Sequence, residues 1–282
     1  MHLEINGNKM TIHIYSDSFG ANDGPGSWPA ELEKLQNQEV ISKGCGGTGP
    51  NWSLRKLITH LGGPHDLYRH FKSQDTIIVL LSDQKRMEFP WLEKSLTDGQ
   101  FLSAENPPLP SDTLLTFFRK AIPQYQTHES EVKIVANTLG PMFLYENVKN
   151  ITFLHLLSKQ FKKFNFLVFT CFSLDHFTSK YKNFNIKSTK LLHDLNFECL
   201  NTTNFYYVST PISYMVGKYP GPQKDVLDNH MTVEQNEKFA LFCNAILNKE
   251  DPDTSWFAYT AYDDPFAEHL GTEPPPPIFI YE

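Results

Sequence analysis

The sequence predicts an α/β fold in which helices cover both faces of a central, mostly parallel sheet. Short apolar runs of strand length alternate with longer segments of helical periodicity along the chain. This alternation is typical of parallel sheets, because parallel strands are joined by crossover helices. The strand candidates are apolar throughout and do not alternate with polar residues, as expected of strands buried on both faces.

Five strands are expected in this sheet. They span residues 11–15, 39–42, 76–81, 132–136 and 166–170. Helices are predicted at about 28–37, 51–61, 112–126 and 151–163. The first helix has Ser27 as its expected N-cap and Pro29 in its first turn, which are favoured residue types at those places.

A last helix is predicted after Thr232. Thr232 and Gln235 have the spacing of a capping box, in which each side chain bonds the other residue's backbone N–H. Apolar residues then recur at the spacing of one buried helix face. They are Phe239, Phe242, Cys243 and Ile246.

Residues 1–250 are expected to form one domain with two insertions. The segment 82–111 contains four prolines, and the segment 171–229 lacks clear periodicity. Both are predicted to lie over the carboxyl edge of the sheet. Residues 251–282, which include four consecutive prolines, are predicted to form an extended C-terminal arm, because such a run is stiff. Its apolar end would pack on this domain or dock on a partner.

Composition excludes several classes of function. The 282 residues are 40% hydrophobic, so a large core is available. The formal net charge of −7 argues against a general binder of nucleic acid or of anionic membranes. No apolar run approaches the roughly 18 residues of a membrane span, and the first residues do not resemble a signal peptide. We therefore expect a cytoplasmic or virion-associated protein.

Metal and cofactor chemistry is not expected. Cys45, Cys171, Cys199 and Cys243 are widely spaced without a Cys-x-x-Cys element, which predicts free thiols. The histidines do not recur at the spacing of convergent ligands. We predict no metal site and no cofactor.

Serine, aspartate and histidine residues occur at both ends of the predicted domain. Ser18 follows the first strand within Ser16-Asp17-Ser18, while Asp228 and His230 precede the last helix. A serine nucleophile with a histidine base and an acid is the residue set of a hydrolytic triad. Asp225 is the reserve candidate for the acid. Serine and aspartate after a strand are also common in turns, where both bond nearby amides.

From about residue 10 to 248 the chain resembles the SGNH (GDSL-type) hydrolases. In that family a flavodoxin-like α/β/α three-layer sandwich carries the catalytic residues in short, separated blocks. Ser16-Asp17-Ser18 matches the last two residues of the Gly-Asp-Ser block, and Gly47 matches the oxyanion-hole glycine after the second strand. Asp228 and His230 match the last block. The resemblance implies a catalytic triad of Ser18, Asp228 and His230, with backbone N–H groups of Ser18 and Gly47 in the oxyanion hole.

The third block departs from the family pattern. Where the family has Gly-x-Asn-Asp, this chain reads Leu81-Ser82-Asp83-Gln84. The asparagine is an oxyanion donor in the family, and loss of one donor typically costs about 100- to 1,000-fold in rate. Ser82 or Gln84 could donate in its place, whereas an ionised Asp83 could only accept, and Arg86 is the nearest strong donor that could stabilise the charge. Arg86 and Asp83 are the candidates for substrate binding, although a surface pairing of Arg86 with a nearby acid is the alternative.

Two smaller departures concern spacing and backbone. Ser16 replaces the first glycine of the family pattern, which is acceptable if that residue has a negative φ. The acid Asp228 precedes His230 by two residues, where the family commonly has three. These departures leave two functions open.

The first function is a serine esterase that forms an acyl-enzyme. Its substrate would be a small-molecule ester or an acylated carbohydrate, with O-acetyl groups on carbohydrate as the first candidate. The alternative is a catalytically weak or inactive SGNH-like domain that serves as a binding or structural component of a larger assembly, for example a phage virion. In that case the C-terminal arm would contact a protein partner or a second copy.

Overall fold

The structure is a computed structural model. It describes residues 10–21, 24–45, 49–62, 71, 74–82, 146, 148–171, 200–208, 210–216 and 231–258. Its centre is a five-stranded sheet with the order β2-β1-β3-β4-β5. The strands are β1 (Thr11–Tyr15), β2 (Glu39–Ser42), β3 (Thr76–Leu81), β4 (Asn165–Thr170) and β5 (Phe205–Val208).

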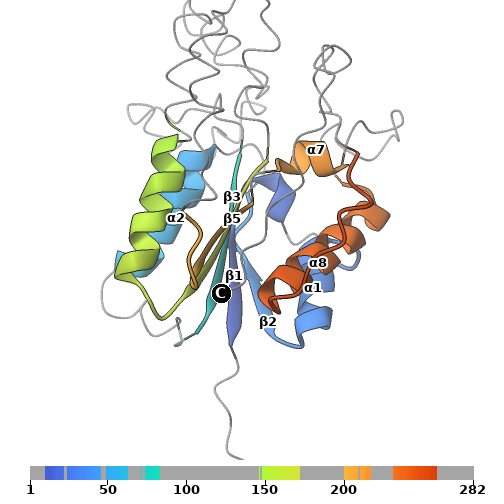
Figure 1. The fold of residues 1–282 in the computed structure, drawn as a ribbon, viewed down its shortest axis with the longest axis horizontal. Coiled ribbons are helices and arrows are strands. Elements are labelled where there is room, and N and C mark those ends of the chain that lie inside the picture. Colours follow the sequence, from blue (N-terminus) through green and yellow to red (C-terminus); the bar gives the residue numbers. More distant parts are fainter. Residues whose placement is uncertain are drawn as a thin grey trace, which may run out of the picture.

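Every neighbouring pair of strands is parallel. Helices cover both faces of this sheet (Figure 1). The arrangement is a flavodoxin-like three-layer α/β sandwich, and the predicted fold class is confirmed.

Two apolar clusters fill the spaces on either side of the sheet. On one face, α1 (Trp28–Gln36) and α8 (Val233–Leu247) pack against each other and against β1, β3 and β4. On the other face, α2 (Pro50–Gly62) lies beside the helical residues 148–160, which are green in Figure 1. The strands contribute alternate residues to the two clusters, so the central strands are buried on both sides.

The predicted helix ends are observed at α1 and α8. Ser27 is the N-cap of α1 and proline stands in its first turn. The Ser27 hydroxyl, however, donates to the Gly24 carbonyl (2.8 Å) and does not cap the helix. At α8 the capping box of Thr232 and Gln235 is present, and the four residues predicted for the buried face are all buried.

The fifth strand differs from the prediction. The predicted strand 132–136 and helix 112–126 lie outside the described residues. β4 pairs directly with β3, and the fifth strand is β5, within the segment 171–229 that we expected to be irregular. The same segment also contains the short helix α7 (Ile212–Val216). That expectation is wrong for these residues, because a four-residue strand between polar residues is too short to show a period.

The beginning of the predicted C-terminal arm packs on the domain. Phe257 is only 6% exposed and its ring lies 5.3 Å from that of Phe242 on α8. The Ala258 backbone N–H donates to the Met215 carbonyl on α7 (3.0 Å). Burial of this aromatic side chain holds residues 251–258 against α8, and the rest of the predicted arm, residues 259–282, lies outside the described residues. Among the described residues, no helix has the length and apolar character needed to cross a membrane.

Candidate active site

Three of the strands end at polar residues on one edge of the sheet. Ser16 and Asp17 follow β1, Ser82 follows β3 and Cys171 follows β4. Because all strands are parallel, their carboxyl ends meet at the same edge, which is where open α/β sheets bind their ligands. The candidate site is built on this edge.

The chain turns sharply after β1. Ser16 and Asp17 are fully buried, and a single 3₁₀ turn, η1 (Ser18–Gly20), begins at once. The Asp17 carboxyl oxygen Oδ1 accepts the backbone N–H of Phe19 (3.0 Å). This bond closes the turn in the manner of an N-cap. The predicted nucleophile Ser18 is therefore the first residue of a helical turn, and the hydrogen bond from the Phe19 N–H to the buried Asp17 carboxyl group holds the backbone of that turn.

The same carboxyl group joins the ends of three strands. Asp17 Oδ2 accepts a hydrogen bond from the Ser82 hydroxyl, and Cys171 Sγ lies 4.0 Å from Asp17 Oδ1. Ser82 and Cys171 are both buried. A buried polar group costs free energy unless it is hydrogen-bonded, and here the polar groups satisfy one another. Asp17 thus connects the first and third blocks of the predicted site.

This bond gives Ser82 a partner other than the predicted oxyanion. A serine hydroxyl has one hydrogen to donate, and that of Ser82 is donated to Asp17. The side chain is also only 1% exposed. The geometry favours a role for Ser82 in holding the Asp17 carboxyl group. Other donors would then have to stabilise the predicted oxyanion.

The loop after β2 lies directly against η1. The Ser42 hydroxyl donates to the Gly20 carbonyl, and the Gly44 N–H donates to Ser42 Oγ (3.1 Å). A Cβ atom on Gly44 would lie 2.5 Å from the backbone nitrogen of Ala21. Only glycine allows so close an approach of two backbones. The second block of the predicted site therefore packs against the first.

Ser16 occupies its place without backbone strain. It is not among the described residues with a positive φ, so the condition for replacing glycine there is met. Its hydroxyl donates to the Asp17 carbonyl (2.8 Å). A Cβ atom on Gly20 would lie only 2.0 Å from Ser16 Oγ. The serine that departs from the family pattern thus requires glycine four residues later.

Tyr15, the last residue of β1, is anchored on the face of the sheet that α2 covers. Its hydroxyl lies 2.8 Å from His60 Nδ1 on α2. Burial raises the pKa of the Tyr15 hydroxyl well above its ordinary value. Tyr15 therefore stays neutral and acts as a hydrogen-bonded anchor for the strand that leads to Ser18.

Several predicted site residues lie outside the described residues. They are Gly47, Asp83, Gln84, Arg86, Asp225, Asp228 and His230. The structure describes the backbone of Ser18 and the residues that follow His230. Met231 is buried in the same apolar cluster as Phe19, the residue after Ser18. The residues that directly follow the predicted nucleophile and the predicted base therefore belong to the same cluster.

The sequence predicts that serine and aspartate in Ser16-Asp17-Ser18 can bond nearby amides, and Asp17 does so at Phe19. It does not predict the contacts of Gly20, Gly44 and Cys171. Gly44 and Cys171 contact segments that are distant in the sequence, and Gly20 contacts Ser16, four residues earlier, in the folded turn. These contacts could be found only from the three-dimensional arrangement.

Two cavities in the described part of the chain are not lined by Asp17, Ser82 or Cys171. One of about 150 Å³ is lined by the start of β4, by residues 201–206 and by the end of α8, at the amino edge of the sheet. A groove of about 330 Å³ lies between α2 and residues 149–153. Within the described part of the chain, no group of three or more His, Cys, Asp or Glu side chains could hold a metal ion.

Comparison with known proteins gives two distant structural similarities. No protein-family model matches the sequence, and no curated protein matches it. One similar structure is assigned to a lipolytic protein of the G-D-S-L family from Desulfitobacterium hafniense DCB-2. It has 9% identity and a TM-score of 0.40, over 84% of this chain and 99% of that chain.

The other similar structure is a carbohydrate esterase family 2 enzyme with a carbohydrate-binding domain from Corynascus thermopiles (Myceliophthora fergusii). It has 11% identity and a TM-score of 0.42, over 86% of this chain and 66% of that chain. Both similarities are too distant to show a shared activity.

Proposed function

We propose that this protein is a serine esterase of the SGNH type with Ser18 as its nucleophile. The turn after β1 supports the proposal. The Asp17 carboxyl group closes η1, which begins at Ser18, and it also ties that turn to the ends of β3 and β4. A nucleophile at a strand end needs a backbone held in one position, and this network supplies one.

In the proposed reaction His230 accepts the proton of the Ser18 hydroxyl as the oxygen attacks an ester carbonyl. Backbone N–H groups of Ser18 and Gly47 stabilise the oxyanion of the tetrahedral intermediate. Collapse of the intermediate releases the alcohol, which takes the proton from His230, and leaves an acyl group on Ser18. Water, deprotonated by His230, then attacks the acyl group, and the bond to Ser18 breaks as His230 returns the proton to the Ser18 oxygen and the acid is released. Asp228 accepts from the other imidazole nitrogen and fixes the tautomer.

The proposed substrates are esters of small acids or lipids, with O-acetyl groups on carbohydrate first among them. Arg86 and Asp83 remain the candidates for contacts with the substrate beyond the reacting ester. Arg86 would supply a fork of N–H donors for a carboxylate or hydroxyl group. Ser82 is assigned to the support of Asp17, because its hydroxyl donates there.

One observation favours a second candidate function. The third block lacks the family asparagine, and the nearby Ser82 hydroxyl is bound to Asp17. A domain with a reduced oxyanion hole could serve as a non-catalytic component of a larger assembly, with residues 259–282 contacting a protein partner or a second copy. In that case the buried network around Asp17 would only stabilise the fold.

Hydrolysis of p-nitrophenyl acetate distinguishes the two functions. The wild-type protein should hydrolyse this ester above the buffer rate, and both Ser18→Ala and His230→Gln should return the rate to that of buffer. Ser255→Ala, an exposed serine outside the site, is the matched control and should keep the wild-type rate. Equal rates in wild type, Ser18→Ala and Ser255→Ala would reject the esterase and favour the assembly role.

A further inference from the structure

Two hydrogen-bonding side chains lie between the segment of the predicted nucleophile and that of the predicted base. Trp28, the first residue of α1, is 1% exposed, and its indole N–H donates to the Phe19 carbonyl (2.6 Å). Phe19 directly follows Ser18. The ring of Trp28 also meets the Phe239 ring of α8 edge-on, with centroids 5.1 Å apart. Trp28 is therefore fixed on the nucleophile side by its N–H and on the α8 side by its ring.

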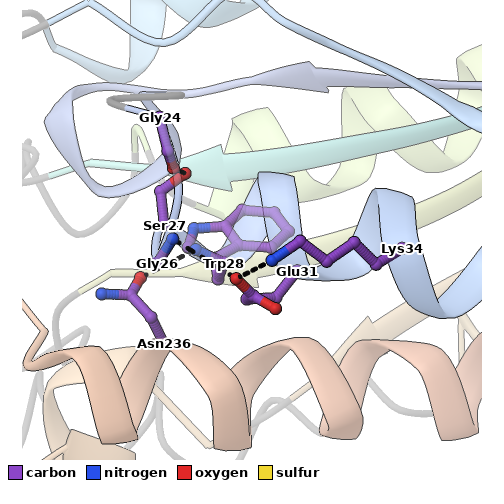
Figure 2. Close-up of polar contacts among 7 residues, drawn as sticks. All are labelled: Gly24, Gly26, Ser27, Trp28, Glu31, Lys34 and Asn236. Atoms are coloured by element: carbon purple, nitrogen blue, oxygen red, sulfur yellow. Dashed lines mark hydrogen bonds and ion pairs between the residues drawn. The ribbon is translucent and has the colours of Figure 1, made fainter.

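Asn236 on α8 continues the connection. Its Oδ1 accepts the backbone N–H of Trp28 (3.0 Å), as Figure 2 shows. Its Nδ2 donates to the carbonyls of Met231 (3.2 Å) and Thr232 (3.0 Å). Met231 directly follows His230. Only one orientation of the amide satisfies all three bonds, because oxygen accepts and nitrogen donates.

The loop before α1 is itself held by local bonds. Gly26 N–H donates to Glu31 Oε1 (3.3 Å), and Glu31 forms an ion pair with Lys34 (2.7 Å). The Ser27 hydroxyl donates to the Gly24 carbonyl. These contacts surround the Trp28 N–H that reaches Asn236 (Figure 2). The first residue of α1 thus has a defined position, from which it can position a neighbour.

We infer that Trp28 and Asn236 form a hydrogen-bonded bridge that holds Met231, the residue after His230, at a fixed separation from Phe19, the residue after Ser18. The bridge runs from the Phe19 carbonyl through Trp28 and Asn236 to the Met231 carbonyl, in three hydrogen bonds. The inference rests on the proposed function, since it gives the bridge a purpose in the triad. Trp28 and Asn236 are positioning residues in this account, because they act through the neighbours of Ser18 and His230.

The far end of the same helix pair provides a matched control. There, Gln36 on α1 donates to Asn244 Oδ1 on α8 (2.8 Å). Asn244 is also an asparagine of α8 that accepts from α1, but it lies two helical turns away from the candidate site. Asn236→Leu and Asn244→Leu therefore both remove an amide between the two helices, and only the first removes the bridge.

The test measures the rate at which a fluorophosphonate probe labels Ser18, as a function of pH, in full-length protein of verified fold. Asn236→Leu should slow labelling by about 10- to 100-fold, as expected when a base moves by about 1 Å. It should also shift the pH profile. Trp28→Phe, which keeps an aromatic ring and loses the N–H, should do the same. Asn244→Leu should keep both the wild-type rate and the wild-type profile.

If Asn236→Leu does not fold, the labelling rate of Asn236→Asp is measured in its place. The carboxylate can still accept from Trp28 but cannot donate to Met231, so labelling should again be slow. If the wild type is labelled and Asn236→Leu is labelled as fast as Asn244→Leu, the inference is overturned and the proposed function is left intact.

Absence of labelling in the wild type would reject the proposed function. In that case NMR tests the bridge independently of activity. The imidazole signals of His230, assigned with His230→Gln, should shift in the folded Asn236 variant and remain unchanged in Asn244→Leu. Unchanged His230 signals in both variants would overturn the inference.

Discussion

At the scale of single residues, the candidate site depends on close contacts that the sequence pattern around each residue does not predict. Asp17 has partners on η1 and at the ends of β3 and β4. Ser16 and Gly20 occupy adjacent space, as do Gly44 and Ala21. Each contact limits the conformations that are open to the turn that carries Ser18.

Gly20→Ala should destabilise the fold, because the added methyl group would overlap Ser16 Oγ. Overpacking of this kind typically costs about 1–3 kcal/mol. The substitution Ser16→Gly removes the overlapping atoms, so the double variant Ser16→Gly/Gly20→Ala should recover part of the loss. The measurement is the free energy of unfolding in urea for the two single variants and the double variant. Strictly additive losses would show that the two side chains do not compete for the same space.

The stability of the protein should fall below neutral pH, in part because of His13. This side chain is buried on β1, with Nε2 3.3 Å from Asp75 Oδ2, while Asp75 Oδ1 accepts the Thr11 N–H. Burial lowers the pKa of His13 from its ordinary value of 6.5, although Asp75 and Glu39 act to raise it. The unfolded chain therefore takes up this proton at a higher pH than the folded chain does.

The contribution of His13 is fully present above its ordinary pKa and is lost as pH falls from that value toward the lowered pKa of the folded state. We expect His13→Gln to flatten this part of the profile, because glutamine does not titrate. The measurement is the free energy of unfolding of both proteins in urea from pH 8 to pH 5. The other histidines contribute equally to both profiles, so the difference between the profiles reports on His13. Parallel profiles would show that His13 makes no contribution.

At the scale of elements, the start of α8 determines where the segment after His230 enters the fold. The Thr232 hydroxyl accepts the Gln235 N–H (3.1 Å), and the Gln235 side chain accepts the Thr232 N–H (2.8 Å). Thr232→Ala should cost about 1 kcal/mol in the free energy of unfolding, the usual value for a lost cap. Thr232→Ser should keep most of the stability, since it keeps the hydroxyl. Equal losses in both variants would contradict a capping role.

The sequence predicts most of these elements because their signals are local. The capping box at Thr232, the apolar runs of β1 and β3, and Pro29 in the first turn of α1 all depend on neighbours in the chain. β5 depends on pairing with β4 and is too short to show a period. The network around Asp17 joins residues more than 60 and 150 positions apart, which no local pattern encodes.

At the scale of the whole molecule, α8 organises one face of the sandwich. It packs on α1, contacts the core of the sheet and receives the returning chain at Phe257. The same helix starts next to the predicted base. Stability of this face and alignment of the triad are therefore coupled in our account.

Removal of residues 259–282 should leave the stability of the domain nearly unchanged, whereas removal of residues 251–282 should lower it. The longer deletion takes away Phe257, and loss of a buried phenylalanine typically costs about 3–5 kcal/mol. Phe257→Ala in the full chain should show a similar loss. Thermal unfolding of the three proteins gives the comparison. A 1–250 protein as stable as the 1–258 protein would contradict the packing of this segment on α8.

The shorter deletion also tests the assembly role. A protein of residues 1–258 that loses association with a partner or a second copy, while it remains folded, would support that role for residues 259–282. Unchanged association would reject it.

Ser18 is proposed to be an activated nucleophile, and site-mapped labelling can show whether it is. The protein is treated with a fluorophosphonate probe, digested and analysed by mass spectrometry, with Ser18→Ala as the control. We expect a stoichiometric adduct on Ser18 that is absent from the variant. A folded wild-type protein without an adduct on Ser18, or with the adduct on another serine, would contradict this proposal.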